Sequence, residues 1–218
     1  MAIRIKEQNY SEADLILMFG LERIKTPYTP LMTEWMDAKT SLNDIEQAIF
    51  DKLWLRAVNN LEGWQEEDLK MKFLSPILEL CNLMDDPDFQ TYFEKTVSAT
   101  VEGHFLKTKC DLMFAKGVLD KPQTPYFHFQ EWKPHKKPTG DSMAQLLEAL
   151  LIAQELNTSK FPMYGGEVAG KQWSFVILEG RRYCISKSYN ATDKDDLLEI
   201  IAILRKFKEL LKTRFLKV

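Results

Sequence analysis

The chain has 218 residues, of which 45% are hydrophobic and 28% charged, and its net charge at pH 7 is −3. This composition is typical of a globular domain, and it excludes a bulk polycation, so any binding of nucleic acid must come from a local basic patch. The three cysteines, Cys81, Cys110 and Cys184, lie in apolar segments without a CxxC pair. This favours buried reduced thiols over structural zinc or a disulfide framework.

No feature of the sequence indicates a membrane or export. The N-terminal segment has no long apolar core and no small-residue cleavage pattern. No run approaches the roughly 18 apolar residues of a membrane span. We therefore expect a cytoplasmic protein without membrane association. Because no Pro/Gly/Ser-rich linker separates two cores, residues 1–218 are predicted to form a single domain.

The first third of the chain is predicted to be helical. A short helix is expected over Ser11 to Phe19, with Ser11 as its N-cap. A long helix starts from Ser41, and its apolar residues four apart predict a buried stripe of Ile45, Ile49, Leu53 and Ala57. A further helix runs from about Gln65 to Leu83, where Pro76 should kink or interrupt it. Its apolar side comprises Leu69, Phe73, Ile77 and Leu80.

The middle of the chain favours strands. Thr96 to Gly117 is rich in β-branched and aromatic residues and predicts two strands with a turn near Lys107, and the stretch PYFHFQEWKP predicts a third. A helix follows, with Ser142 and Gln145 in the spacing of a capping box.

Three more short strands are expected between Met163 and Asn190, with turns at 169–171 and 179–181. A last helix begins at a Thr192–Asp195 capping box and runs to about Phe215. This order predicts an α/β fold, with a mixed sheet covered by helices.

Asp111, Glu131 and Lys133 stand out because they are charged residues within apolar, strand-like segments. Alternate residues of a strand share a face, so Glu131 and Lys133 point the same way. Burying them is costly unless they are paired or bind something. If the two segments form an antiparallel hairpin, Asp111 falls near both. Two carboxylates suit Mg²⁺, and a neighbouring lysine can orient a water or balance phosphate charge, which indicates phosphodiester hydrolysis.

Asp111, nineteen intervening residues and then Glu131–Trp132–Lys133 on a strand before a helix resemble the PD-(D/E)XK nuclease superfamily. The order of elements from about Gln65 to Ser188 is also similar to that superfamily's core. Cys110 stands where its signature has proline, a position that varies widely. The resemblance implies a restriction-endonuclease-like mixed β-sheet flanked by helices over residues 63–190. Residues 1–62 would be an N-terminal helical addition and 191–218 a long C-terminal helix.

The resemblance also implies a metal site. Asp111 and Glu131 would bind Mg²⁺ or Mn²⁺. Many members carry an outer glutamate ligand on the helix before the sheet, some ten residues before a proline. Glu66 lies ten residues before Pro76, which favours Glu66 over Glu67.

Further residues would handle the water and the nucleic acid. Lys133 would position the attacking water or stabilise the developing negative charge. Gln145, on the helix after the lysine strand, would help to orient a water or the substrate. DNA is the expected nucleic acid, although the sequence does not separate it from RNA. Its contacts are predicted at the basic residues Lys136, Lys137, Arg181 and Arg182. A homodimer would suit a double-strand cutter, although no segment indicates one.

Structural alternatives exist for each residue. Asp111 would simply end a hairpin turn, and Glu131–Lys133 would be a surface salt bridge that contributes about 0–1 kcal/mol. Glu66 is favoured in a first helical turn by the helix dipole. Gln145 would only complete a capping box with Ser142. At the level of function, the alternatives are an inactive nuclease fold that binds nucleic acid or protein, and an unrelated α/β protein with a coincidental motif.

Overall fold

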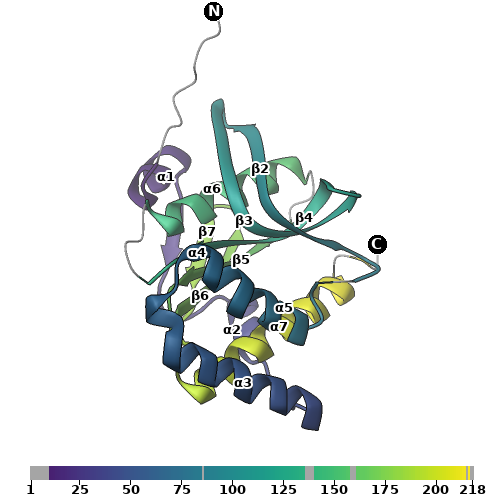
Figure 1. Cartoon of the computed structure of the whole chain (residues 1–218). Coiled ribbons are helices and arrows are strands. Elements are labelled where there is room, and N and C mark those ends of the chain that lie inside the picture. The colour runs from purple at the N-terminus through teal and green to yellow at the C-terminus, as the bar shows by residue number, and fades with distance from the viewer. Residues whose placement is uncertain (1–9, 85, 136–139, 158–160, 215, 217–218) are drawn as a thin grey trace, which may run out of the picture.

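The computed structural model describes residues 10–84, 86–135, 140–157, 161–214 and 216 (Figure 1). The helices are α1 (Glu12–Phe19), α2 (Pro30–Met36), α3 (Asp44–Asn60), α4 (Glu66–Leu69), α5 (Ser75–Leu80), α6 (Ser142–Leu156) and α7 (Lys194–Arg214). The strands are β1 (Glu22–Ile24), β2 (Gln90–Val101), β3 (His104–Val118), β4 (Lys121–Lys133), β5 (Met163–Ala169), β6 (Gln172–Glu179), β7 (Arg182–Ile185) and β8 (Tyr189–Asn190).

These strands form one mixed sheet in the order β1-β7-β6-β5-β4-β3-β2, with β8 paired to β6. The β4–β5 and β1–β7 pairs are parallel and the other pairs are antiparallel. α6 forms the crossover that a parallel β4–β5 pair requires. It lies against β2 to β5 on one face, with α1 packed on it, while α2, α3, α5 and α7 lie on the other side (Figure 1). The expected α/β arrangement is confirmed.

The sheet divides the hydrophobic core in two. Leu112, Trp132 and the buried residues of α5 and α7 belong to one cluster, and Met113, Phe129 and the buried residues of α6 belong to the other.

All three cysteines are free and buried, as expected. His128 is fully buried, and its burial lowers its pKa to about 3, so its ring is neutral at pH 7. No helix in the described part of the chain has the length and apolar character needed to cross a membrane.

The N-terminal segment differs in part from expectation. α1 begins as predicted: the Ser11 side chain accepts a hydrogen bond from the Asp14 N–H, and the Asp14 carboxylate accepts one from the Ser11 N–H. The segment is not purely helical, however, because β1 joins the sheet beside β7. Its three residues are exposed or half-buried, so no apolar alternation marks them as a strand.

The expected stripe on α3 is wrong in its first half. Ile45 and Ile49 are 74% and 43% exposed, and the buried residues are Phe50, Leu53 and Ala57. Four residues turn an α-helix about 40° beyond a full turn, so a strict four-residue repeat drifts off the buried side. Steps of three and four residues stay on it. The helix also begins later than predicted, at Asp44 with Asn43 as its N-cap.

The next helical segment is interrupted before Pro76, as predicted. A π-helical turn over Lys70–Leu74 separates α4 from α5. Proline lacks the N–H that would bind the carbonyl four residues earlier. That carbonyl belongs to Lys72, and it accepts a hydrogen bond of 2.7 Å from Nη1 of Arg56 instead. The expected apolar side is confirmed, since Leu69, Phe73, Ile77 and Leu80 are buried.

The turn expected near Lys107 lies elsewhere. β2 and β3 are joined at Glu102 and Gly103, whose φ angles of 48° and 84° are those of a two-residue hairpin turn that matches the twist of the strands. Lys107 lies within β3. The turns at 169–171 and 179–181 are confirmed.

Two expected capping boxes are wrong. Asp141 is the N-cap of α6, and its carboxylate accepts from the Ala144 N–H at 2.9 Å, so Ser142 is already helical. At α7 the carboxylate of Asp193 accepts from the N–H groups of Asp195 and Asp196. In both places an aspartate next to the expected residue accepts the hydrogen bonds.

Candidate active site

Asp111 lies within β3, next to β4. The antiparallel register pairs Leu112 with Gln130, which places Asp111 beside Glu131. The main-chain N–H of Trp132 donates to Oδ2 of Asp111 at 2.7 Å. Asp111 is only 8% exposed. The expected hairpin and the closeness of the two acids are therefore confirmed, and Asp111 does not simply end a turn.

Glu131 and Lys133 form a pair at the end of β4. Nζ of Lys133 donates to Oε1 of Glu131 at 2.6 Å, and the two side chains are 12% and 5% exposed. This is not the surface salt bridge of the structural alternative. Trp132 is fully buried on the opposite face, where its Nε1–H donates to Gln130. As expected for a central strand, β4 has a neighbour on each side.

In β3, the regular alternation of side chains between the two faces of the sheet is interrupted at Asp111. Cys110 and Leu112 are two residues apart and would ordinarily share a face, yet they pack in the clusters on opposite sides of the sheet. On β2, Phe93 pairs with Leu112, which places Glu94 opposite Asp111. Glu94 has a φ angle of 55°, in the left-handed region. The backbone is distorted at the Glu94–Asp111 pair. Both carboxylates therefore lie where the alternation of β3 side chains between the two faces of the sheet is interrupted.

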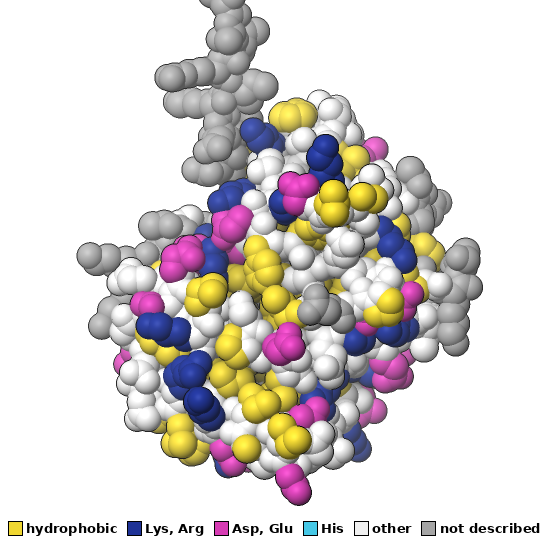
Figure 2. Space-filling view, turned by 45° about the vertical axis from the view of Figure 1, so that its right-hand side comes forward, with side chains coloured by type: hydrophobic (Ala, Val, Ile, Leu, Met, Phe, Trp, Pro, Cys, Tyr) yellow, Lys and Arg dark blue, Asp and Glu magenta, His cyan; other side chains and the backbone are white. Residues whose placement is uncertain are grey.

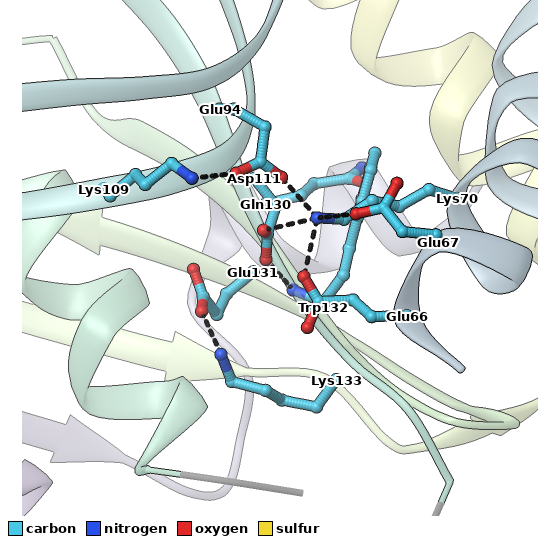
Figure 3. Close-up of polar contacts among 10 residues, drawn as sticks. All are labelled: Glu66, Glu67, Lys70, Glu94, Lys109, Asp111, Gln130, Glu131, Trp132 and Lys133. Atoms are coloured by element: carbon cyan, nitrogen blue, oxygen red, sulfur yellow. Dashed lines mark hydrogen bonds and ion pairs between the residues drawn. The ribbon is translucent and has the colours of Figure 1, made fainter.

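Lys70 reaches this point from the π-helical turn (Figure 3). Its Nζ lies 2.6 Å from Oε1 of Glu66 and 3.2 Å from Oδ1 of Asp111, and it also pairs with Oε1 of Glu94. The other oxygen of Glu94 pairs with Lys109. Glu131 and Lys133 lie apart from this cluster, on the other side of Asp111 (Figure 3). Asp111 therefore lies between two sets of charges.

Three of these carboxylates could hold a metal ion. One oxygen from each of Glu66, Glu94 and Asp111 lies within 4.8 Å of the others. Glu131 is outside this group of three. A donor set made only of carboxylate oxygens suits a hard cation such as Mg²⁺ or Ca²⁺, which keeps waters in its remaining positions. The residues present therefore fit a divalent cation.

The electrostatics of the two buried acids favour an added positive charge. Burial raises the pKa of Asp111 above its usual value, and the hydrogen bond from Trp132 and the charge of Lys70 offset only part of this. Burial raises the pKa of Glu131 to about 7, with a further contribution from the charge of Asp111, against the opposing effect of Lys133. Both carboxylates are therefore costly to ionise, and a bound cation would relieve that cost.

For Lys70 and Glu94, the effect of the neighbouring charges on the pKa is larger than the effect of burial. Burial lowers the pKa of Lys70, but the hydrogen bonds to Glu66 and Glu94 and the charge of Asp111 outweigh it and raise this pKa above its usual value. Burial also acts on Glu94, where the contacts with Lys109 and Lys70 prevail and lower its pKa. Lys70 and Glu94 are consequently both charged at neutral pH.

Gln145 does not form the expected capping box with Ser142. Its side-chain oxygen is buried and has no hydrogen-bond partner among the described residues. It lies beside Gly140, where an added Cβ would be 3.5 Å away. The structural alternative for Gln145 is therefore wrong, while its role toward water or substrate stays a prediction.

The predicted nucleic-acid contacts remain without support. Lys136 and Lys137 lie outside the described residues. Arg181 pairs with Glu102, and Nε of Arg182 lies 3.5 Å from Oε2 of Glu22. Acidic partners thus already balance both arginine charges.

Sequence reasoning missed Lys70 and Glu94. The signal for Lys70 was its spacing four residues after Glu66, which places both on one side of a helix. Glu94 had no comparable signal, because β2 was expected to begin after it, at Thr96. Neither residue is found from the D…ExK pattern alone.

No family model matches this chain, and no curated protein matches its sequence. The class of site therefore rests on the geometry of the residues.

Proposed function

We propose that this protein is a metal-dependent nuclease that hydrolyses phosphodiester bonds of nucleic acid, in the first place DNA. One observation carries the proposal: Asp111 and Glu131 are buried side by side on neighbouring strands, with Lys133 held against Glu131 at 2.6 Å. This arrangement supports the resemblance to the PD-(D/E)XK nucleases. We accordingly propose a restriction-endonuclease-like core over residues 63–190.

Asp111, Glu66 and Glu94 would hold Mg²⁺ or Mn²⁺, because one oxygen of each lies within 4.8 Å of the others. Glu131, the other acid predicted to bind the ion, lies outside this group and would act beside it, next to Asp111 and Lys133. When bound, such an ion supplies positive charge to phosphate oxygens and makes a water more acidic. Asp111 is oriented for this role by the main chain of Trp132 rather than by a mobile side chain.

Lys133 would act on the attacking water or on the phosphate. An ammonium has three N–H donors, and its contact with Glu131 engages one of them. Among the described residues no other acceptor contacts this ammonium. Its remaining N–H groups would donate to a water or to a phosphate oxygen, where they would stabilise the negative charge that develops. Glu131 fixes the direction of the ammonium, so its orientation is set before substrate binds. Gln145 would assist by donating or accepting a hydrogen bond.

Charge on the surface would guide the substrate only locally. Figure 2 shows basic and acidic side chains interspersed on the face that it presents, with apolar side chains between them. Together with the net charge of −3, this favours a substrate held by a few contacts near the site over one held by a broad basic field.

The test is cleavage by the purified protein. Plasmid, single-stranded DNA and RNA are incubated with Mg²⁺, Mn²⁺ or EDTA, beside the variants Lys133→Met and Lys121→Met. Lys121 lies exposed at the other end of β4, so it controls for the loss of one positive charge on the same strand. We expect metal-dependent cutting that falls about 100-fold or more in Lys133→Met and is unchanged in Lys121→Met. Equal cutting by Lys133→Met and the unsubstituted chain would contradict the proposal.

A second candidate is a nuclease fold without turnover, which binds nucleic acid or protein. One observation favours it: Glu66, Glu94 and Asp111 already have a cationic partner in Lys70. In that case the ion pairs serve the fold, and no divalent ion binds. Calorimetry with Mn²⁺ distinguishes the two candidates, because only the nuclease requires binding that Asp111→Asn weakens.

A further inference from the structure

Lys70 already contacts the carboxylates that would bind a metal ion. Nζ of Lys70 lies 2.6 Å from Glu66 and 3.2 Å from Asp111, and it also pairs with Glu94. These are the three residues whose oxygens lie within 4.8 Å of one another. The Lys70 side chain is only 9% exposed. A metal ion that used these carboxylates would therefore compete with the ammonium for them.

The charges around the site favour either the Lys70 ammonium or a divalent metal ion, but not both together. Glu66, Glu94 and Asp111 carry three negative charges, and Lys70 and Lys109 carry two positive charges. One negative charge is left over. If a divalent ion replaces Lys70, the cluster becomes neutral, whereas a divalent ion beside Lys70 gives it a net positive charge. The side chains of Lys70 and Asp111 are only 9% and 11% exposed. A second cation beside the buried ammonium of Lys70 is therefore costly, so exchange is favoured over joint occupancy.

The surroundings also offer Lys70 another partner. Oε1 of Glu67 lies 4.0 Å from Nζ of Lys70, and the Glu67 side chain is 83% exposed. A lysine side chain has four rotatable carbons, so its ammonium can move toward Glu67 and solvent without a shift of the main chain. Glu67 is thus placed to receive the ammonium outside the cluster.

We propose that Lys70 is a displaceable internal cation. It neutralises Glu66, Glu94 and Asp111 while no metal is bound, and it moves toward Glu67 when a divalent metal enters. This inference rests on the proposed metal site and adds its regulation: a metal ion binds only at concentrations that overcome a tethered competitor. The site would therefore respond to the concentration of the free metal.

The first test is metal affinity, measured by calorimetry with Mg²⁺ and Mn²⁺ in the absence of nucleic acid. Lys70→Met keeps most of the unbranched apolar side chain and removes the ammonium with its charge. Lys107→Met is the control, because Lys107 is exposed on the same strand as Asp111 and belongs to none of the ion pairs of the cluster. We expect Lys70→Met to bind metal roughly tenfold or more tightly than the unsubstituted chain. We expect Lys107→Met to change the affinity by less than about threefold.

The second test needs no variant and so does not depend on the folding of Lys70→Met. The unsubstituted protein is acetylated briefly with and without Mg²⁺, and the modified lysines are quantified by mass spectrometry. We expect Lys70 to react slowly without metal and several-fold faster with it, because the ammonium leaves its buried pairs. Lys52, which is exposed on α3, is the internal reference and should react equally in both conditions.

The outcomes separate this inference from the proposed function. Tighter binding by Lys70→Met with metal-dependent exposure of Lys70 supports displacement. Metal binding with equal affinity in both chains, while Lys70 stays protected, overturns displacement and leaves the metal site intact. Absence of metal binding in both chains overturns the metal site and displacement together. Metal binding with displacement but without any cutting supports the inference and contradicts the nuclease.

Discussion

The main-chain N–H of Trp132 on β4 donates a hydrogen bond to Oδ2 of Asp111 on β3, with an N···O distance of 2.7 Å. A side-chain carboxylate thus takes the place of a main-chain carbonyl at the point where the alternation of β3 slips. The bond leaves Oδ1 of Asp111 for Lys70. It fixes the central acid of the proposed site to the backbone, which is the kind of rigid support that a functional site needs.

This bond predicts different effects for two substitutions of Asp111. Asp111→Asn keeps a side-chain oxygen for the Trp132 N–H and removes the negative charge. We expect it to fold nearly as stably as the unsubstituted chain and to lose about 100-fold or more of any nuclease activity. Asp111→Ala also leaves a buried N–H without an acceptor, so it should be less stable than Asp111→Asn by about 1–3 kcal/mol. Urea unfolding at pH 7 measures the difference, and equal stability of the two variants would contradict the role of the bond.

Glu131 and Lys133 should be strongly coupled in stability. At pH 8, Lys133→Met leaves a buried carboxylate without its cation, whereas adding Glu131→Gln removes that charge as well. A double-mutant cycle is therefore expected to give a coupling of about 1–3 kcal/mol. Lys206 and Glu209 on α7 lie 2.9 Å apart with side chains 24% and 62% exposed. This pair is the control, with an expected coupling below about 0.5 kcal/mol. Similar coupling in both pairs would show that burial of Glu131 and Lys133 adds nothing.

The left-handed backbone at Glu94 predicts an inverted preference for glycine. In a strand, glycine is ordinarily less favourable than alanine by about 0.5–1 kcal/mol. Glu94 has a φ angle of 55°, which glycine adopts freely and alanine does not. Glu94→Ala and Glu94→Gly both lose the contacts with Lys70 and Lys109, so their difference isolates the backbone. We expect Glu94→Gly to be the more stable by about 1 kcal/mol in urea unfolding. Thr100 in the same strand is the control, where Thr100→Ala should be more stable than Thr100→Gly.

The part of the site that the sequence predicted depends on local rules. Asp111, Glu131 and Lys133 are charged residues in apolar strands, and two-residue alternation together with one hairpin is enough to bring them together. The hairpin pairing and the interruption before Pro76 both follow from neighbouring residues. Both predictions are confirmed.

The part that the sequence did not predict depends on exceptions to those rules. Glu94 faces Asp111 because β2 begins at Gln90 and its alternation slips, which no local pattern indicates. Lys70 keeps the four-residue spacing to Glu66, but this spacing does not show that its ammonium also reaches Glu94 and Asp111 on two strands of the sheet. The turn placed near Lys107 failed for a simpler reason, since Glu102–Gly103 supplied the stronger hairpin signal. Long-range contacts and backbone distortions therefore account for the missed residues.

The buried glutamate of α6 gives a prediction of pH dependence away from the proposed site. Glu148 is 6% exposed, and its Oε1 accepts a hydrogen bond of 3.0 Å from the Lys107 N–H. Burial raises the pKa of Glu148 from 4.5 to about 7, and the hydrogen bond from Lys107 offsets only part of that effect. The folded protein consequently holds this proton more tightly than the unfolded chain. The contribution of Glu148 to stability is complete below pH 4.5 and is lost as the pH rises through 7.

Glu148→Gln keeps the oxygen that accepts from Lys107 and cannot ionise. We expect this variant to be more stable than the unsubstituted chain by about 2–3 kcal/mol at pH 8, because the cost of burying a charge is removed. At pH 5 the difference should shrink toward zero, because Glu148 is then protonated in the folded protein. Glu155→Gln, at an exposed position on the same helix, is the control and should change stability by less than about 0.5 kcal/mol at both pH values. Urea unfolding at pH 5 and pH 8 checks the prediction, and a stabilisation by Glu148→Gln of the same size at both values would contradict it.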